Sequence, residues 1–506
     1  MMNFIDSALN RITMYRLMLY YVIGLLVAAF GLGFFGLVPN DPTALTFSTF
    51  VILAVCWITN RLFAAALNVP VNAESVYITA FILALIMPSV TAANLPGLAG
   101  LVLVSFVAIA SKFVLAIHHK HIFNPVAIGV AVSALALDQP ATWWVGGNLP
   151  MAPLVLLGGL IVLRKVQRFD MVGVYLLANL VVTLATSSLS QYGETLAQSL
   201  LYSPLLFAGF AMLTEPLTAP HAKRARLAYG AIVGALSSAN VHVMSFYFTP
   251  EIAFVVGNIF AWVVSPKGRF KLTLVGVEQM AAGCYDFIFA SNRKLGFRPG
   301  QYLDWTLDVA SPDSRGNRRS FTIASAPSED QVRLGVKFYP GPSAFKRALA
   351  KMRLGDVIYG SQLAGEFTLP SDNDAKLAFI AGGIGVTPFR SMMQELLDKQ
   401  TPRPIVMLYG NNSGDEIAYA DVFDKAEREL GIKTVYAVVG DAPADRANVH
   451  HGFIDVELIQ REVPDYGDRT FYISGPRAMV VQFQNLLSDL GVASSRIKVD
   501  YFPGYA

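Results

Sequence analysis

The sequence predicts a polytopic α-helical membrane domain of about ten spans over residues 1–266, an antiparallel β-barrel over 267–370 and an α/β domain with a parallel sheet over 375–506. The first observation is charge. Residues 1–266 contain 11 Lys and Arg and 8 Asp and Glu, whereas the rest of the chain contains 28 of each. Charge density rises about threefold at one point, as expected where a membrane domain precedes a water-soluble one. The second observation is a change in the period of the apolar residues within the charged half.

Ten apolar stretches predict the membrane helices, because a helix needs about 20 mostly apolar residues to cross the hydrocarbon core. They cover residues 17–38, 45–66, 74–90, 97–117, 123–137, 151–164, 171–188, 199–214, 227–246 and 250–265. The two short stretches 123–137 and 151–164 carry Asn124-Pro125 and Gly158-Gly159 at or near their ends. Either these are interrupted helices that line a cavity, or their ends lie elsewhere.

The positive residues give the orientation. All 11 fall on one side of the ten-span arrangement, and the opposite loops contain neither Lys nor Arg; those loops are 39–44, 91–96, 138–150, 189–198 and 247–249. Cytoplasmic loops are enriched in Lys and Arg. We therefore expect a multi-pass protein of the bacterial inner (plasma) membrane with cytoplasmic N- and C-termini.

Haem, an iron–sulfur cluster and other metal centres are not expected. Haem between helices needs facing histidines, and the membrane half offers no such pair; its histidines are His118, His119, His121, His221 and His242. The segment from His118 to His121 is predicted to be a solvated loop. The two cysteines, Cys56 and Cys284, are too few for a cluster.

Two patterns in the membrane half resemble a known family. His121-Ile122-Phe123-Asn124-Pro125 opens one span, and Ala211-Met212-Leu213-Thr214-Glu215-Pro216-Leu217-Thr218-Ala219-Pro220 closes another. Together with the ten stretches, they resemble the flavin-carrying membrane subunits of the Rnf complex and of the sodium-pumping NADH:quinone reductase. The resemblance covers most of residues 15–265 and raises the hypothesis of a second flavin, FMN or riboflavin, in the membrane domain.

The family carries covalent FMN on a Ser-Gly-Ala-Thr motif, which this chain lacks. Thr142 stands in the corresponding loop without that context, so covalent attachment is not expected. Trp143 and Trp144 are predicted to be interfacial anchors. Glu215 has two open interpretations, a buried ligand for a proton or cation or a residue at a helix end.

After residue 266 the apolar residues alternate with polar ones. Phe270–Leu274 and Val332–Phe338 are examples, and such alternation predicts antiparallel strands. From Ala375 the pattern changes again, and apolar strands at Leu377–Ala381, Pro404–Tyr409, Thr434–Val439 and Thr470–Ile473 are separated by helical segments at Phe389–Lys399, Ala420–Glu429 and Ala478–Leu490. This alternation predicts a parallel sheet, with Ser371–Asp374 as the linker.

The order of motifs in this half resembles the ferredoxin–NADP reductase family, in which a barrel binds FAD and an α/β domain binds the nicotinamide nucleotide. Pro299-Gly300-Gln301-Tyr302 is similar to the turn before the flavin strand, and Arg319-Ser320-Phe321-Thr322 to the Arg-x-Tyr-Ser/Thr motif. The resemblance implies that Arg319 binds the pyrophosphate as a forked donor, Phe321 stacks on the flavin and Thr322 hydrogen-bonds near its N5. The FAD-binding residues implied by this match are Tyr302, Arg319, Ser320, Phe321 and Thr322.

A further phosphate loop follows the flavin motif. Lys337, Gly341 and Ser343 resemble this loop of the family. The resemblance therefore adds these three residues to the FAD site.

Gly382-Gly383-Ile384-Gly385-Val386-Thr387-Pro388 lies between a predicted strand and a predicted helix. Glycines allow close approach of nucleotide phosphates, and a helix N-terminus favours an anion. The nucleotide site is therefore assigned to the glycine turn, and the resemblance to the family adds a second turn near residue 475. The residues of the site are Gly382, Gly383, Gly385, Thr387, Pro388, Gly475 and Pro476.

The resemblance also implies the catalytic positions. Ser474 precedes Gly475-Pro476, where the family often has Cys. Asp500-Tyr501-Phe502 is similar to the family's acidic-x-aromatic ending, in which an aromatic ring covers the flavin. Catalytic roles are assigned to Thr322, Ser474 and Phe502, and Tyr501 is assigned to cofactor binding.

The loop Gly410–Glu416 favours NADH over NADPH. A 2′-phosphate would be bound by Arg or Lys, whereas this loop contains Asp415 and Glu416 and no basic residue.

The sequence thus predicts a membrane-bound, flavin-dependent oxidoreductase that passes electrons from NAD(P)H through FAD to a membrane-associated acceptor. The expected partners are membrane lipid, NAD(P)H and an acceptor such as a quinone or a partner redox protein, without nucleic acid. Two alternatives remain open, a redox-coupled ion or solute transporter and a membrane-anchored reductase of the soluble type.

Overall fold

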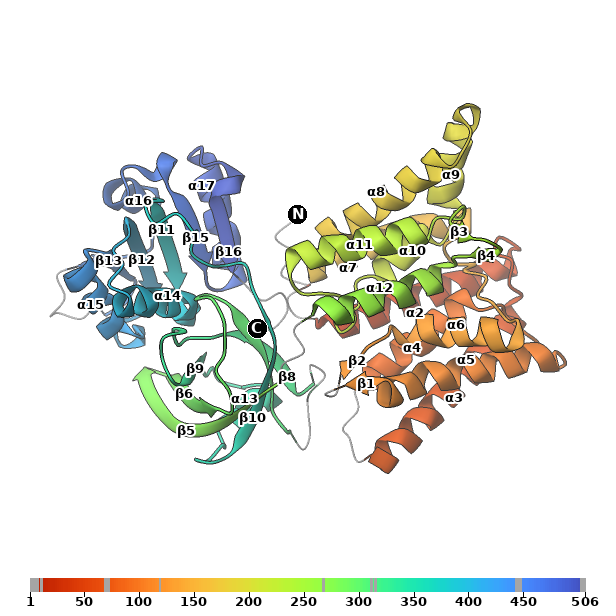
Figure 1. Cartoon of the computed structure of the whole chain (residues 1–506), viewed down its shortest axis with the longest axis horizontal. Helices are drawn as coiled ribbons and strands as arrows, with labels where there is room; N and C mark the ends of the chain where they lie inside the picture. Colours follow the sequence, from red (N-terminus) through yellow and green to blue (C-terminus); the bar gives the residue numbers. More distant parts are fainter. Residues whose placement is uncertain are drawn as a thin grey trace. The chain divides into compact units, whose positions relative to one another are not determined.

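The computed structural model describes residues 9, 12–67, 73–117, 120–265, 269–309, 313, 316–441 and 448–500. The chain forms two compact units, Met1–Ser265 and Pro266–Ala506. Helices dominate the first unit, and two six-stranded sheets organise the second (Figure 1).

The described part of the N-terminal unit is built from apolar helices and two short hairpins. The helices are α2 (Met14–Phe34), α3 (Pro42–Leu67), α4 (Ala73–Ile86), α5 (Leu95–Val114), α6 (Pro125–Leu137), α7 (Ala152–Val166), α8 (Phe169–Ala185), α9 (Tyr192–Leu201), α10 (Leu205–Phe207), α11 (Lys223–Leu236) and α12 (Pro250–Val264). The hairpins are β1 (Ala116–Ile117) with β2 (Lys120–His121), and β3 (His242–Val243) with β4 (Phe246–Tyr247).

Four stretches of helix among the described residues are long and apolar enough to cross a membrane; they are Met14–Phe34, Pro42–Leu67, Leu95–Val114 and Leu149–Val166. A fifth is added if Tyr192–Leu201 and Leu205–Met212, which meet at a bend of 51°, form one span. Four further apolar helices have only 10–17 residues. These helices mark the unit as a membrane domain, whereas the expected number of ten spans remains a prediction.

The elements of this unit occur twice in the same order. A series of helices is followed by the hairpin β1–β2 and then by α6; a second series is followed by β3–β4 and then by α12. Both α6 and α12 begin with a proline, which suits the first helical position. α5 packs on α6 as α11 packs on α12, and α6 also contacts α12. The unit therefore has the organisation of an internal repeat.

Gly158 and Gly159 do not interrupt a helix, so of the two alternatives the interrupted helix was wrong, and the ends of the stretch lie elsewhere, at Leu149–Val166. Both lie inside α7, where a Cβ on Gly158 would approach the ring of Tyr21 to 2.4 Å and one on Gly159 would approach that of Phe210 to 2.1 Å. The two glycines instead allow neighbouring helices to pack closely. The irregular backbone lies at Ala208–Met212, a π-helix that continues α10.

The C-terminal unit begins with an antiparallel sheet in the order β8-β7-β10-β5-β6-β9. Its strands are β5 (Phe270–Ala281), β6 (Cys284–Ser291), β7 (Tyr302–Thr306), β8 (Arg318–Thr322), β9 (Val332–Lys337) and β10 (Val357–Ala364). The sheet curls around a core that includes Trp305, since the backbone N–H of Ala324, just after β8, donates to the carbonyl of Arg333 in β9 at 2.9 Å. Helix α13 (Ala344–Leu349) packs its apolar residues into the same core.

The second sheet is parallel, in the order β14-β13-β12-β11-β15-β16. Its strands are β11 (Leu377–Gly382), β12 (Ile405–Asn411), β13 (Lys433–Val438), β14 (Val449–His451), β15 (Thr470–Ser474) and β16 (Ile497–Asp500). Side chains of β11 alternate between two cores. Phe379 faces α14 (Thr387–Asp398) and α15 (Ala420–Leu430), whereas Ile380 faces α16 (Val456–Glu462) and α17 (Arg477–Asp489).

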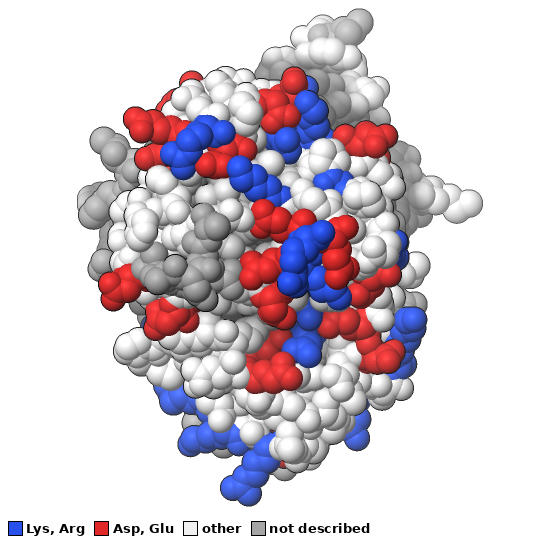
Figure 2. Space-filling view, turned by 90° about the vertical axis from the view of Figure 1, so that its left-hand side faces the viewer, with Lys and Arg blue, Asp and Glu red and all other residues white. Residues whose placement is uncertain are grey.

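The predicted strand Val332–Phe338 and the predicted elements of the parallel-sheet part are confirmed to within about two residues at each end, whereas β5 continues seven residues beyond the predicted Phe270–Leu274. Figure 2 shows that acidic and basic side chains are interspersed on one face of the molecule. Such a mixed surface agrees with the equal numbers of positive and negative residues after position 266.

Candidate functional site

The carboxyl ends of three neighbouring strands form the centre of the candidate site. Ala381 of β11 pairs with Ser474 of β15, and Ser474 pairs in turn with Asp500 of β16. After β11 the chain continues to β12 on one side, while β15 lies on the other. This edge is a topological switch point, where open parallel sheets bind ligands outside the carboxyl ends of their strands.

Two glycine-containing turns pack against each other at this edge. A Cβ on Gly385 would lie 2.5 Å from Cα of Gly475, and one on Gly382 would lie 2.3 Å from Sδ of Met479. The glycine at position 385 is therefore required by the packing of the backbone itself, whereas the neighbour of Gly382 is a flexible side chain. Gly383 differs, because its φ is +50° and a Cβ there would meet no heavy atom within 4 Å. The open side of the turn is at Gly383.

The glycine turn leads directly into α14. Thr387 and Pro388 form its first turn, and both are buried. Thr387 also packs against β9, since a Cβ on Gly335 would lie 2.8 Å from its Cγ2. The helix N-terminus, which favours anions, is thus held against the antiparallel sheet.

Thr322, at the end of strand β8, lies at the same edge of the parallel sheet. Its Oγ1 lies 3.4 Å from Oδ2 of Asp500, and in the sheet it pairs with the partly exposed Tyr302. Burial raises the pKa of the Asp500 carboxyl to about 7, although the hydrogen bond with Thr322 lowers it. The structure therefore brings together Thr322, Tyr302, Ser474 and the glycine turn, and it adds Asp500, whose chemistry is that of a group titrating near neutral pH.

Arg319 is buried and bound to a carboxylate of the chain itself. Its Nη2 donates to Oδ1 of Asp313 at 3.0 Å, and the backbone N–H of Ala344, at the start of α13, donates to Oδ2 of the same residue at 3.0 Å. Phe321 lies on the same face of β8 and contacts Phe345, with the ring centroids 5.9 Å apart. Ser320 points the other way and donates to Asp304.

The predicted phosphate loop is occupied by internal contacts. Lys337 forms an ion pair of 2.7 Å with Glu416. Burial lowers the pKa of Lys337, but the bond to Glu416 outweighs it and leaves the pKa raised. Gly341 adopts φ +73°, and Ser343 caps α13 by accepting from the N–H of Lys346 at 3.3 Å. The contacts described for these three residues do not include Thr322, and their proposed role in binding remains a prediction.

Tyr501 and Phe502 lie outside the described residues. Gly475 and Pro476 connect β15 to α17, and Pro476 is exposed beside the packed turns. The predicted nucleotide residues therefore surround one edge of the parallel sheet.

The membrane unit has polar contacts of its own. Nε2 of His121 lies 3.0 Å from Oε1 of Glu215, and Thr218 donates to the other carboxylate oxygen. His121 is buried, so the prediction of a solvated loop was wrong for this residue; His118 and His119 lie outside the described residues. Asn124 begins α6 by accepting from the N–H groups of Val126 and Ala127, which is the usual helix cap.

Trp143 and Trp144 are buried, and their prediction as interfacial anchors was wrong. The Trp143 indole donates to Oε2 of Glu251 at 3.2 Å, and the Trp144 indole donates to the carbonyl of Met87 at 3.1 Å. Thr142 donates to the carbonyl of Ile86. This segment therefore supplies hydrogen-bond donors to the carbonyls at the C-terminal end of α4, which an isolated helix leaves unsatisfied.

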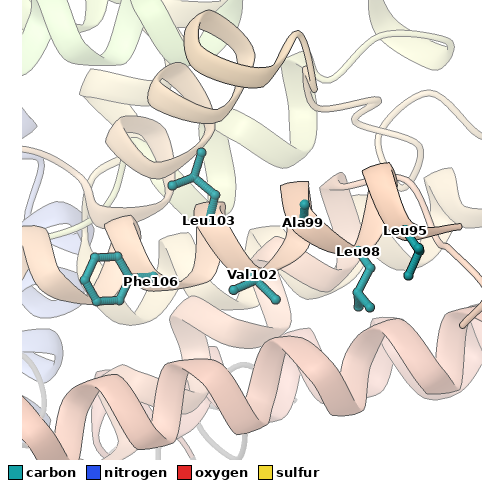
Figure 3. Close-up of a pocket in the computed structure, with 6 residues that line it drawn as sticks. All are labelled: Leu95, Leu98, Ala99, Val102, Leu103 and Phe106. Carbon is teal, nitrogen blue, oxygen red and sulfur yellow. The ribbon is translucent and has the colours of Figure 1, made fainter.

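An apolar groove of about 450 Å³ runs along α5 (Figure 3). It is lined by Leu95, Leu98, Ala99, Val102, Leu103 and Phe106. These side chains offer no polar group to orient a cofactor, and such a surface suits lipid chains. No group of three or more potential metal ligands occurs among the described residues.

Two family models match different parts of the chain. Residues 145–265 match the NQR2, RnfD, RnfE family, and residues 379–485 match the oxidoreductase NAD-binding domain. The chain therefore joins a membrane-subunit domain of the NQR2, RnfD, RnfE family to an NAD-binding oxidoreductase domain.

Curated relatives are similar to part of the chain. Flavohemoprotein of Pseudomonas putida is 28% identical over 243 residues, which are 47% of this chain and 59% of the relative. Flavohemoprotein of Bacillus subtilis is 27% identical over 210 residues, 41% of this chain and 51% of the relative. The chain thus spans about half the length of the curated relatives it matches.

Among solved structures, the FAD/NAD-binding domain of nitric oxide dioxygenase from Vibrio cholerae has a TM-score of 0.41 at 20% identity, covering 46% of this chain and 98% of that one. Flavohemoglobin from Malassezia yamatoensis has a TM-score of 0.44 at 18% identity, covering 69% of this chain and 97% of that one.

Proposed function

We propose that this protein is a membrane-bound oxidoreductase that passes electrons from NAD(P)H, through FAD, to an acceptor associated with its membrane domain. One observation carries the proposal most directly: Thr322, on the strand with the flavin motif, contacts Asp500 beside the glycine turn of the NAD-binding domain. This contact supports a flavin reductase site whose two halves meet at this point. The matched family domains support both the oxidoreductase and its link to a membrane.

The residues at this edge fit a dinucleotide. Gly383 borders open space at the N-terminus of α14, so backbone N–H groups and the helix dipole can face a phosphate there. The nucleotide is assigned to Gly382, Gly383, Gly385, Thr387, Pro388, Gly475 and Pro476.

The FAD site is assigned to β8 and its neighbours. Arg319 offers a forked donor for a pyrophosphate, and Asp313 already places an anion between this guanidinium and the N–H of Ala344. An anion at this position is therefore compatible with the donors present. When bound, FAD supplies the exchange between two-electron and one-electron chemistry. The residues assigned to it are Tyr302, Arg319, Ser320, Phe321, Thr322, Lys337, Gly341, Ser343 and Tyr501.

Thr322, Ser474 and Phe502 retain the proposed catalytic roles, and Asp500 joins them. With a pKa near 7, its carboxyl can hold or release a proton at Oδ2 beside the Thr322 hydroxyl. Thr322 orients the reacting group, and Ser474 lies between Ala381 and Asp500 in the sheet.

NADH is the proposed donor rather than NADPH. The loop after β12 places the exposed Asp415 next to Ser413, whose hydroxyl donates to it. Glu416 pairs with Lys337, which leaves that lysine neutralised. A 2′-phosphate near this loop would meet negative charge.

The acceptor is proposed to be a quinone or a partner redox protein, reached directly or through a second flavin, FMN or riboflavin, in the membrane domain. We further propose ten spans in an inner membrane with cytoplasmic termini, and domains at 1–266, 267–370 and 375–506. The repeated order of helices and hairpins supports five spans in each half. Labelling of single cysteines placed at residues 147 and 373 in intact cells tests the orientation, since only the first is expected to react with an impermeant reagent.

The experiment that tests the function is anaerobic reduction of the purified full-length protein by NADH. The flavin absorption near 450 nm is expected to bleach, as a flavin that accepts hydride does. A flavin that stays oxidised with both NADH and NADPH would contradict the proposal.

Redox-coupled ion transport is the second candidate function. The observation that favours it is the His121–Glu215 pair, which lies just beyond the π-helix of a bent helix pair. Acidic residues within membrane domains often mark ion pathways. If NADH oxidation in sealed proteoliposomes generates no ion gradient, the transport function is excluded while the reductase function stands.

A further inference from the structure

A buried ionic network joins β6 of the antiparallel sheet to the chain just before α15 of the parallel-sheet part. Asp286 is fully buried, and its Oδ1 accepts a hydrogen bond of 2.9 Å from the Tyr419 hydroxyl. Its Oδ2 accepts a bond of 3.1 Å from Nη1 of Arg333 in β9. A buried carboxylate is costly unless it is paired and hydrogen-bonded. Asp286 is therefore stabilised by two partners, Arg333 and Tyr419, and the second is 133 residues away in the sequence.

Tyr419 has an unusual backbone conformation. Its φ is +58°, in the left-handed region that a bulky side chain rarely adopts. Residues held in such conformations cluster at sites where the surrounding structure needs them in one place. In this conformation the tyrosine hydroxyl reaches Asp286 of β6 and lies next to Gly335 of β9.

The hydroxyl of Tyr419 lies where the nucleotide turn meets the antiparallel sheet. A Cβ added to Gly335 of β9 would lie 2.5 Å from this hydroxyl, 2.8 Å from Cγ2 of Thr387 and 3.6 Å from Cδ1 of Ile384. Ile384 belongs to the glycine turn, and Thr387 is the first residue of α14. The hydroxyl of Tyr419 and the start of α14 therefore both lie against the same residue of strand β9.

A second ion pair fixes α14 one turn further along. The guanidinium of Arg390 donates to both carboxylate oxygens of Glu329 and, at 3.1 Å, to the carbonyl of Ala324, two residues after Thr322. Its Cζ also lies 5.7 Å from the centre of the Tyr419 ring. Tyr419 thus contacts α14, which carries the proposed nucleotide site, and strands β6 and β9 of the sheet that also contains the flavin strand β8.

We propose that Tyr419 is a positioning residue, whose hydrogen bond to Asp286 holds the start of α14, and the nucleotide bound there, at reacting distance from the flavin strand β8. This inference rests on the proposed function. Hydride transfer depends steeply on geometry, and a displacement of about 1 Å can reduce a rate about 100-fold. A bond that fixes the two parts against each other therefore acts on the rate of transfer more than on nucleotide affinity.

The test compares Tyr419→Phe with Tyr436→Phe in the full-length protein. Tyr436 is also buried, and its hydroxyl donates to Asp424 at 2.8 Å, but both residues belong to the parallel-sheet part. Each substitution removes one hydroxyl from a Tyr–Asp pair and keeps the ring. Anaerobic stopped-flow bleaching by NADH gives the maximal rate and the Kd, and a thermal melt reports stability.

For Tyr419→Phe we expect the maximal rate to fall about tenfold, with the Kd for NADH within about twofold of the wild type. Tyr436→Phe is expected to leave the rate unchanged at a similar melting temperature. Equal maximal rates in the two variants would overturn the inference while leaving the proposed function intact.

If NADH does not reduce the wild-type protein at all, the proposed function is refuted. Hydrogen exchange then still tests the positioning role of Tyr419. Amides of residues 383–390 and 332–337 are expected to exchange faster in Tyr419→Phe than in Tyr436→Phe, because the contact between α14 and β9 loosens. Identical exchange in both variants would overturn the positioning role whatever the activity.

Discussion

At the scale of single residues, the candidate site depends on Thr322 and Asp500. The flavin motif in the sequence identified Thr322, because the motif is local. Asp500 gains its character from burial beside a strand 178 residues earlier, and no local pattern carries that information. The same applies to Asp286, whose partner Tyr419 is far away in the chain.

The raised pKa of Asp500 predicts a pH-dependent stability. Burial raises its pKa from 3.8 to about 7, so the folded protein binds more protons than the unfolded chain between these values, and stability falls as pH rises through this window. Asp500→Asn removes the ionisation. We expect the melting temperature of this variant relative to wild type to increase from pH 5 to pH 8. A difference that stays constant over this range would argue against the raised pKa.

The charge of Asp415 predicts the choice of nucleotide. We expect Asp415→Asn to raise kcat/KM for NADPH several-fold and to leave that for NADH nearly unchanged, because a repulsion of about 1 kcal/mol is removed. Glu429→Gln, which removes an equal charge at the end of α15, is the control. An equal change in kcat/KM for NADPH in both variants would show that the loop does not discriminate against the 2′-phosphate.

At the scale of elements, strands and helices of the C-terminal unit followed from the sequence because period-two and strand–helix alternation are local signals. The structural reason for individual glycines did not follow from the sequence. Gly382 and Gly385 of the nucleotide turn and the two glycines of α7 meet neighbouring chain segments, and only the three-dimensional packing reveals which segment is adjacent. Likewise, the burial of Trp143 depends on its contact with Glu251 in α12.

Gly385→Ala is expected to destabilise the C-terminal unit by about 1–3 kcal/mol, because the added methyl group would collide with the backbone of Gly475. Gly276→Ala is the matched control, since its nearest neighbour would lie at 3.5 Å, an ordinary contact. Urea unfolding followed by tryptophan fluorescence measures the difference. Equal stability of the two variants would mean that the turns are not packed as described.

Gly159→Ala is expected to lower the melting temperature in detergent by several degrees, because its methyl group would overlap the Phe210 ring. Gly173→Ala in α8 meets open space and is expected to be neutral or slightly stabilising. If the melting temperature of Gly159→Ala is no lower than that of Gly173→Ala, close packing of α7 on the π-helix is refuted.

At the scale of the whole molecule, the charge asymmetry of the sequence predicted the division into a membrane part and a water-soluble part. The family domains agree with it. The number of spans does not follow from charge, since four apolar helices among the described residues have only 10–17 residues, fewer than the roughly 20 that cross a membrane. The joining of the two parts in one chain is the basis for proposing electron transfer from NADH to a membrane acceptor.

The most direct test of this account is the visible spectrum of the detergent-purified protein before and after anaerobic addition of NADH. We predict a flavin spectrum that bleaches within the mixing experiment, with more than one flavin per chain if the membrane domain also carries one. A Soret band would instead indicate haem among the helices. A flavin spectrum unchanged by NADH and NADPH would contradict the central claim.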